Sequence, residues 1–259
     1  MAKGIKTEFE SRINYETNGF VFYKNCLCKD VLNKALQGVL AVRKGFFNKY
    51  RPSSLISINN PNQIQRITQI HHANKAVFEM LSQSGIGKMV RTITGAKNIK
   101  IWGSQLYYKP PRSGITGQVG FHCDAEHLPF LTGDMITGWI PLTSISDNSG
   151  PLVYVNESHK WQVNFKYSGG EKQNLTKQTK LMQEQHPGVE WVETKALLEV
   201  GDISFHHKDV LHCSTQNLSN APRIAISFGI MTEKTKFVDN QEDYGIRKII
   251  NNPEYSPEL

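Results

Sequence analysis

The sequence predicts a mainly β protein, a sandwich or barrel of short strands, preceded by helices and folded as one domain. Three observations lead to this prediction. Apolar residues recur at helical spacing in the first hundred residues. From residue 100, short β-rich runs are separated by Gly, Pro, Asn and Asp. The 259 residues, with 39% hydrophobic and 20% charged side chains, suffice for one large domain with a buried core.

Residues 1–99 are expected to be mostly helical. The stretch KDVLNKALQGVLAVRKGFFNKY, which begins at Lys29, carries apolar residues close to a 3.6-residue period. A second helical region begins at Asn60-Pro61 and is broken near Gly85 and Gly87. These helices are expected to support a β core.

Residues 100–232 are expected to form that β core. IKIWGSQLYYKPP alternates in polarity and ends on two prolines, as a strand does. Four more β-rich runs follow: MITGWIPLTSI, GPLVYVNES, LLEVGDISFHH and PRIAISFGIMT. Residues 160–195 are polar and rich in Lys and Gln, long for a loop, so we expect them to be partly helical or a lid. Residues 233–259 are expected to be a polar C-terminal tail, and residues 1–259 one domain.

Charge and cysteine content limit the class of protein. The net charge of +7 is scattered along the chain, which favours solvated basic faces or an anionic substrate over a nucleic-acid partner. The four cysteines are too sparse for a disulfide framework, which indicates a reducing cytoplasm. No apolar run of membrane-spanning length and no secretory h-region occur, so we expect a cytoplasmic protein with no membrane partner.

The stretch QVGFHCDAEHLPF contains a candidate pair of metal ligands, His122 and Asp124. Residues two apart on a strand face the same way, so both side chains can reach one ion while Cys123 points away. The alternative is a strand that exposes two polar residues to solvent. A lone His-x-Asp pair is common by chance, so this alternative stays open.

A second segment, GDISFHHKDVLHCSTQNLSNAPRIAISFGI, supplies what the first one lacks. It contains three histidines, His206, His207 and His212. A mononuclear iron site needs two imidazoles and one carboxylate and leaves three positions open. Arg223 lies on the apolar strand that follows, where a buried guanidinium needs an anionic partner. A dicarboxylate would supply that partner with two hydrogen bonds.

The order of these motifs resembles the phytanoyl-CoA dioxygenase branch of the Fe(II)/2-oxoglutarate oxygenases. YYKPP, FHCD, GPLVYVNESHK and GDISFHHKDVLHCSTQNLSNAPR follow one another as in that family, over about half of the chain. The resemblance implies a double-stranded β-helix, a barrel of the jelly-roll or cupin type with the site inside it. It also implies Fe(II) as cofactor, with 2-oxoglutarate and O2 as cosubstrates.

The resemblance assigns the iron ligands to His122, Asp124 and His212. The family's distal histidine is followed two residues later by Ser and eleven residues later by the arginine that binds the cosubstrate. Only His212 fits both steps, with Ser214 and Arg223. His206 and His207 fit neither, and we expect them to cover the barrel or to turn there. One departure is Asn156-Glu157 before Ser158-His159, where the family often has Pro-Gly.

Neighbouring residues receive roles from the same resemblance and from strand parity. Candidate cosubstrate contacts, besides Ser214 and Arg223, are Thr137, Tyr107 and Gln105. Trp139 is a candidate pocket wall, with ordinary core packing as its alternative, and Tyr107 is alternatively a barrel-wall tyrosine. Candidate substrate contacts are Glu126, His127, Trp139 and Phe121.

The implied function is hydroxylation or another oxidative tailoring of a small molecule, in a biosynthetic or secondary-metabolic pathway. The reaction would convert 2-oxoglutarate and O2 to succinate and CO2. Asp124 argues against halogenation, because chlorinating relatives lack this ligand. Gly229 stands where nucleic-acid demethylases of the superfamily carry a second arginine. The alternatives are a cupin-like metal isomerase or hydrolase that does not use 2-oxoglutarate, and a non-catalytic binding protein on the same barrel.

Overall fold

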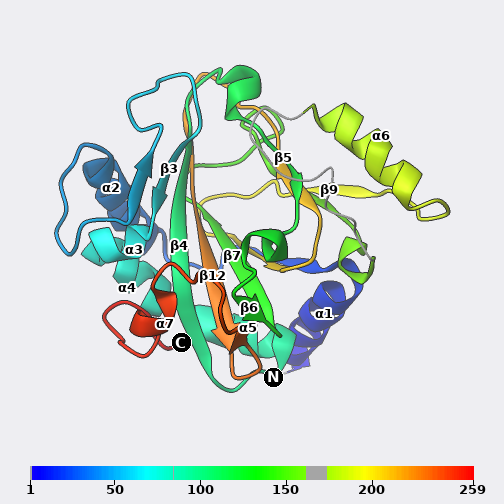
Figure 1. Ribbon diagram of the computed structural model, residues 1–259, viewed down its shortest axis with the longest axis horizontal. Helices are drawn as coiled ribbons and strands as arrows, with labels where there is room; N and C mark the ends of the chain where they lie inside the picture. The colour runs from blue at the N-terminus through cyan, green and yellow to red at the C-terminus, as the bar shows by residue number, and fades with distance from the viewer. Residues whose placement is uncertain (1, 84, 162–173) are drawn as a thin grey trace.

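Two antiparallel sheets face each other in the computed structural model, which describes residues 2–83, 85–161 and 174–259 (Figure 1). The seven-stranded sheet has the order β1-β10-β7-β12-β4-β3-β2 and the four-stranded sheet the order β5-β11-β8-β9. The strands of the large sheet, in that order, are Phe20–Tyr23, Ile203–His207, Met135–Pro141, Arg223–Thr232, Ile99–Lys109, Gln65–Thr68 and Ser54–Ile56. Those of the small sheet are Val119–His122, His212–Ser214, Leu152–Val155 and Glu193–Lys195. The mainly β barrel predicted from the sequence is therefore confirmed.

Strand alternation divides the large sheet into an outer face and an inner face. On β12, Ile224, Ile226 and Phe228 belong to the apolar cluster that the supporting helices cover. The helices that bury this face include α2 (Lys29–Arg43), α4 (Lys75–Gln83) and α5 (Ile86–Thr94). Arg223 and Ser227 have the opposite parity and line the space between the sheets. The functional site is thus built on the inner face.

The N-terminal region contains more β structure than the sequence predicted. Helix α1 (Ala2–Asn18), helix α2, the short α3 (Ile70–Ala73) and the two helices α4 and α5 agree with the prediction, as does the break at Gly85, which has φ 73°. The expectation for residues 65–68 was wrong, because this segment is strand β3 and pairs with β4. Its alternating burial follows from that pairing: Gln65 and Ile67 are buried while Arg66 and Thr68 are half-buried.

The C-terminal residues were expected to be a polar tail, and this prediction was wrong. Strand β13 (Lys236–Phe237) pairs with β6 (Leu131–Thr132), and Ile246 on α7 (Ile246–Ile249) is buried. Closer to the C-terminus, the carbonyl of Tyr255 accepts hydrogen bonds from Nε2 of both His71 and His72, at 2.8 and 2.9 Å. A few apolar side chains and a shared backbone acceptor fix the segment, so its polar composition was misleading.

The polar segment 160–195 contains helix α6 (Leu175–Gln185), as expected of a partly helical region, and residues 162–173 lie outside the described residues. Helix α6 packs against β5, and the Gln178 side chain accepts a hydrogen bond from the Phe121 amide at 2.9 Å. The role of this segment as a lid stays a prediction. None of the helices in the described ranges has the length and apolar character that a membrane crossing requires.

Candidate metal centre

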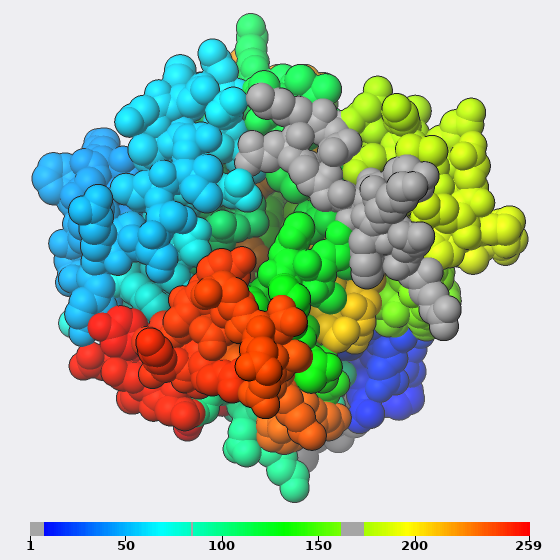
Figure 2. Space-filling view, in the orientation of Figure 1, coloured from blue at the N-terminus to red at the C-terminus, as the bar shows by residue number. Residues whose placement is uncertain are grey.

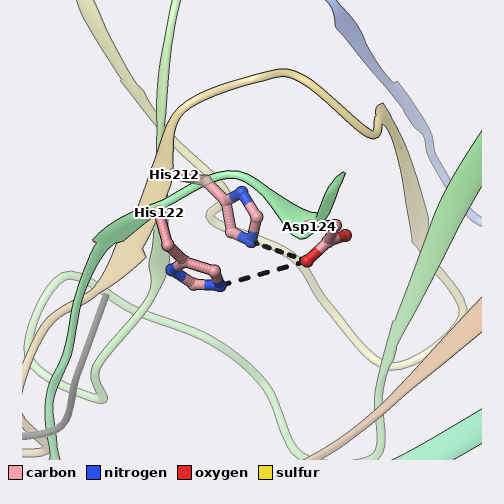
Figure 3. Close-up of side chains that lie close together, drawn as sticks. All are labelled: His122, Asp124 and His212. Atoms are coloured by element: carbon pink, nitrogen blue, oxygen red, sulfur yellow. Dashed lines mark ion pairs between the residues drawn. The ribbon is translucent and has the colours of Figure 1, made fainter. Parts of the chain in front are cut away.

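Two histidines and one aspartate converge where β5 meets β11. His122 and His212 are Cα partners across this strand pair, with ring centroids 4.2 Å apart. Asp124 Oδ1 lies 3.9 Å from Nε2 of His122 and 3.7 Å from Nε2 of His212 (Figure 3). One ligand atom from each residue lies within 4.8 Å of the others. Because β5 ends at His122, the carboxylate is supplied by the 3-10 turn η2 (Asp124–His127) rather than by the strand.

Backbone carbonyls orient both imidazoles for metal binding. Nδ1 of His122 lies 2.9 Å from the Gly120 carbonyl, and Nδ1 of His212 lies 3.0 Å from the Val210 carbonyl. A carbonyl only accepts, so each Nδ1 carries the proton and each Nε2 presents a lone pair. Burial lowers the pKa of His122 and lowers that of His212 well below its ordinary value. Both rings are therefore neutral at neutral pH, as metal ligands must be.

The Asp124 carboxylate is held by two donors on its other oxygen. Oδ2 accepts hydrogen bonds from the Thr137 hydroxyl and, at 2.9 Å, from Nε2 of His206. Burial by itself would raise the pKa of Asp124, but the hydrogen bond from His206 favours the ionised carboxylate, and the pKa lies below its ordinary value. Oδ1 is left facing the two histidines. The expectation that His206 covers the barrel was wrong, because its ring is part of the site.

A small inner cavity lies behind the triad. The buried Arg223 lines it, and the buried Lys109 lies next to Ser214, another of its lining residues. Arg223 is 2% exposed and Lys109 is 0% exposed, and they are cross-strand partners on β12 and β4. Lys109 Nζ donates to Ser214 Oγ at 2.7 Å and to the Thr215 carbonyl. Within the described ranges, no ion pair joins either cation to a carboxylate, and Nε of Arg223 has no hydrogen-bond partner.

Burial strongly disfavours both charges of this pair. It lowers the pKa of Arg223 to about 9, so the guanidinium stays protonated at neutral pH. Burial, and then the charge of Arg223, lower the pKa of Lys109 well below its ordinary value. Two adjacent buried cations without a carboxylate are costly, and an anion between them would relieve both. Sequence reasoning missed Lys109, although strand parity had placed it on the same face as Tyr107 in the YYKPP motif.

A larger outer cavity of about 550 Å³ opens in front of the triad. In Figure 2 this face of the molecule is hollowed between the cyan N-terminal part, the green central part and the orange-red C-terminal part. The outer cavity and the inner cavity share a wall, formed by Tyr107, Val119, His122, Asp124, Thr137 and Ser227. His122 and Asp124 therefore stand at the junction of the two cavities, and His212 lines the inner one.

The structure divides the remaining predicted residues between these cavities. Ser214 and Trp139 line the inner cavity, with Arg223 Cζ 5.5 Å from the Trp139 ring centroid. Gln105 and His127 line only the outer cavity, so the predicted cosubstrate contact of Gln105 does not fit its position. Tyr107 and Thr137 line both cavities, and the Thr137 hydroxyl is used by Asp124.

Two predicted substrate contacts, Glu126 and Phe121, lie outside both cavities. The Glu126 side chain accepts a hydrogen bond from the Cys123 amide at 2.8 Å, which stabilises the turn after His122. Phe121 is 2% exposed and packs against Trp191 in an apolar cluster, with ring centroids 5.5 Å apart. On β5 it has the opposite parity to His122, so it points away from the site. Neither residue lines the inner or the outer cavity.

Comparisons with known proteins agree with this architecture. The family model described as phytanoyl-CoA dioxygenase (PhyH) matches residues 15–225. The peroxisomal phytanoyl-CoA dioxygenase of Homo sapiens is 27% identical over 257 residues, covering 89% of this chain and 70% of that protein. A probable phytanoyl-CoA dioxygenase of Caenorhabditis elegans is 25% identical over 237 residues, covering 84% and 73%.

Solved structures share the fold at lower identity. SnoK, a non-heme alpha ketoglutarate dependent carbocyclase from nogalamycin biosynthesis, superposes with a TM-score of 0.73 at 17% identity, over 96% of this chain and 95% of that one. EctD from S. alaskensis, solved with 2-oxoglutarate and 5-hydroxyectoine, has a TM-score of 0.68 at 14% identity, over 86% and 75%. Because the family model matches most of this chain, the chain belongs to the phytanoyl-CoA dioxygenase family.

Proposed function

We propose that this protein is an Fe(II)- and 2-oxoglutarate-dependent oxygenase that hydroxylates or otherwise oxidises a small molecule. The observation that carries the proposal is the convergence of His122, Asp124 and His212 on an inner cavity that is also lined by the buried Arg223, for which the described residues provide no ion pair. His122 and Asp124 also face the outer cavity. His122, Asp124 and His212 are the proposed metal ligands. Arg223, Ser214 and Lys109 are the proposed cosubstrate contacts.

The donor set fits Fe(II). Two neutral imidazoles and one carboxylate oxygen form the facial triad of non-heme iron oxygenases and leave open positions for cosubstrate and oxygen. The carbonyls behind His122 and His212 and the donors behind Asp124 fix all three ligands from outside. Such hydrogen bonds behind the ligands are typical of a metal site, whereas polar residues on a solvent-exposed face do not need them.

The inner cavity fits the far carboxylate of 2-oxoglutarate. Arg223 offers a fork of donors to that carboxylate, and Lys109 offers a point charge held in place by Ser214. The anion would restore the favourable ionisation of both cations. A cupin-like isomerase or hydrolase that does not use 2-oxoglutarate has no use for this pair, which is why we prefer the oxygenase.

The residues of the chain bind, orient and shield the reactants. Fe(II) held by His122, Asp124 and His212 would supply the oxidation of a substrate C–H bond by O2, coupled to the conversion of 2-oxoglutarate to succinate and CO2. Arg223 and Lys109 fix the direction in which the cosubstrate enters, and Trp139 keeps water from the guanidinium. Tyr107, on the shared wall, separates the cosubstrate from the substrate. Exclusion of water from such a site limits side reactions.

The outer cavity is the proposed substrate site, and its size of about 550 Å³ suits a small organic molecule. Its described lining includes one acidic side chain, Asp124, which the metal would use. Arg66, Gln105 and His127 supply polar contacts there. A biosynthetic role is supported by SnoK, whose name places it in nogalamycin biosynthesis.

Anaerobic titration of the protein with Fe(II) and 2-oxoglutarate tests the proposal. A visible charge-transfer band should appear in the wild type and be lost in His212→Ala. His127→Ala is the matched control, because His127 lies beside His122, with ring centroids 5.7 Å apart, but outside the triad. The band should persist in that control. If the wild type forms no band and, after O2 is admitted, consumes no 2-oxoglutarate, the proposed function is wrong.

A further inference from the structure

Behind Asp124 lies a buried chain of hydrogen-bonding side chains that includes none of the proposed metal or cosubstrate contacts. Nε2 of His206 is 2.9 Å from Asp124 Oδ2, and Nδ1 of His206 is 3.2 Å from the Tyr154 hydroxyl. The Tyr154 hydroxyl is in turn 3.1 Å from Ser204 Oγ. His206 is 1% exposed, and Tyr154 and Ser204 are 0% exposed. The chain is therefore shielded from bulk solvent.

The Asp124 carboxylate determines which group donates in each of these hydrogen bonds. An ionised carboxylate only accepts, so Nε2 of His206 must donate to Asp124. In the tautomer that leaves Nδ1 without a proton, the Tyr154 hydroxyl donates to Nδ1 and accepts from Ser204. Every donor in the chain then points toward Asp124. The Tyr154 hydroxyl thereby favours the tautomer that Asp124 needs.

We propose that His206 is a positioning residue that forces Asp124 to bind the metal through one oxygen. Together with Thr137, it occupies Oδ2, so that only Oδ1 faces the two ligand histidines, at 3.7 and 3.9 Å. A carboxylate that keeps both oxygens free can bind through both of them and take a position needed by the cosubstrate. This inference rests on the proposed function.

The alternative is that the His206 ring only fills space. The ring centroid lies 4.5 Å from that of His212 and 5.2 Å from that of Tyr154, so it is well packed. Three variants separate packing from donation. His206→Phe keeps an aromatic ring and removes the donor, whereas His206→Gln keeps an N–H donor and removes the ring. Tyr154→Phe keeps both rings and removes the hydroxyl partner of Nδ1.

Titration with Co(II) of each variant without 2-oxoglutarate, with its visible ligand-field spectrum recorded, provides the test. His206→Phe should weaken Co(II) binding by about 10- to 100-fold, the usual range for loss of a group that orients a metal ligand. Its spectrum should shift toward higher coordination. His206→Gln should restore the wild-type spectrum, and Tyr154→Phe should weaken binding by less than His206→Phe does.

His207→Phe is the matched control, because His207 is the next residue on β10 and is directed to Asp209 instead. It should bind Co(II) as the wild type does. Unchanged affinity and spectrum in His206→Phe would overturn the inference, and so would a His206→Gln variant as weak as His206→Phe. If His206→Phe does not fold, wild-type affinity and spectrum in Tyr154→Phe overturn it. Failure of the wild type to bind Co(II) instead refutes the proposed function.

Discussion

Replacement of Arg223 by methionine should have opposite effects on the protein alone and on its complex with 2-oxoglutarate. The guanidinium is 2% exposed, its Nε has no partner within the described residues, and Lys109 lies across the strand pair. Removing an unpaired buried charge is neutral or stabilising when an apolar side chain of similar length takes its place. We therefore expect the protein without cosubstrate to keep its stability or to gain up to about 2 kcal/mol.

The loss of cosubstrate binding follows from the same geometry. Removing one member of a buried charge pair costs about 2–5 kcal/mol. Because Lys109 remains beside the anion, we expect the lower part of this range, about 2–3 kcal/mol or ~30- to 150-fold in Kd. At 100 times the wild-type Kd, 2-oxoglutarate stabilises the wild type by about 2.7 kcal/mol. The same concentration stabilises a variant with ~100-fold weaker binding by about 0.4 kcal/mol.

Thermal unfolding of the Co(II)-loaded protein with and without 2-oxoglutarate measures both effects. For a chain of this size, 1 kcal/mol corresponds to about 2–4 °C. The cosubstrate should therefore raise the Tm of the wild type by roughly 5–10 °C and that of Arg223→Met by about 1 °C. Arg66→Met, which changes an arginine of the outer cavity, should keep the wild-type shift. A full shift in Arg223→Met would refute the assignment of Arg223.

Three further predictions concern Lys109, Gly229 and the C-terminal helix. Burial lowers the pKa of Lys109, and a bound anion would raise that pKa again, so 2-oxoglutarate should bind more weakly as the pH rises above neutral. Calorimetry on Lys109→Met should find weaker binding of 2-oxoglutarate and a flatter pH dependence. A Cβ on Gly229 would lie 2.2 Å from the Trp102 ring, so Gly229→Ala should lower the free energy of unfolding in urea by about 1–3 kcal/mol, and by less in a Trp102→Leu background. Ile246→Ala should lower the free energy of unfolding by about 2–4 kcal/mol, and the exposed control Lys248→Ala by under about 0.5 kcal/mol. If the C-terminal residues were an unpacked tail, the two variants would be equally stable.

The sequence predicted the parts of the site that depend on short spacings. His212, Ser214 and Arg223 lie at fixed steps along one segment, and the structure brings Ser214 and Arg223 to the same cavity as the histidine. Strand parity also placed Cys123 away from the site, where it is buried in an apolar cluster. The same parity rule, applied to Phe121, would have removed it from the candidate substrate contacts.

The residues that were missed act across the sheets. Asp124 and His206 are 82 positions apart, and Lys109 and Ser214 are 105 positions apart. Each hydrogen bond joins a strand of the large sheet, β10 or β4, to β11 of the small sheet or to the turn after β5, and no local pattern specifies how the two sheets face each other. Buried polar side chains with no local partner were the available signal, because such groups need a partner elsewhere in the fold.

Position 229 shows how one local irregularity determines what the outer cavity can hold. Between Ile101 and Gly103, strand β4 has a bulge opposite Gly229, and the unpaired residue there is Trp102. The bulge turns the indole onto Gly229, whose missing side chain leaves the space that the ring fills. An arginine at position 229 would have to displace that ring. Trp102 therefore gives the outer cavity an aromatic wall at position 229, and a larger side chain there would change the shape of the proposed substrate site.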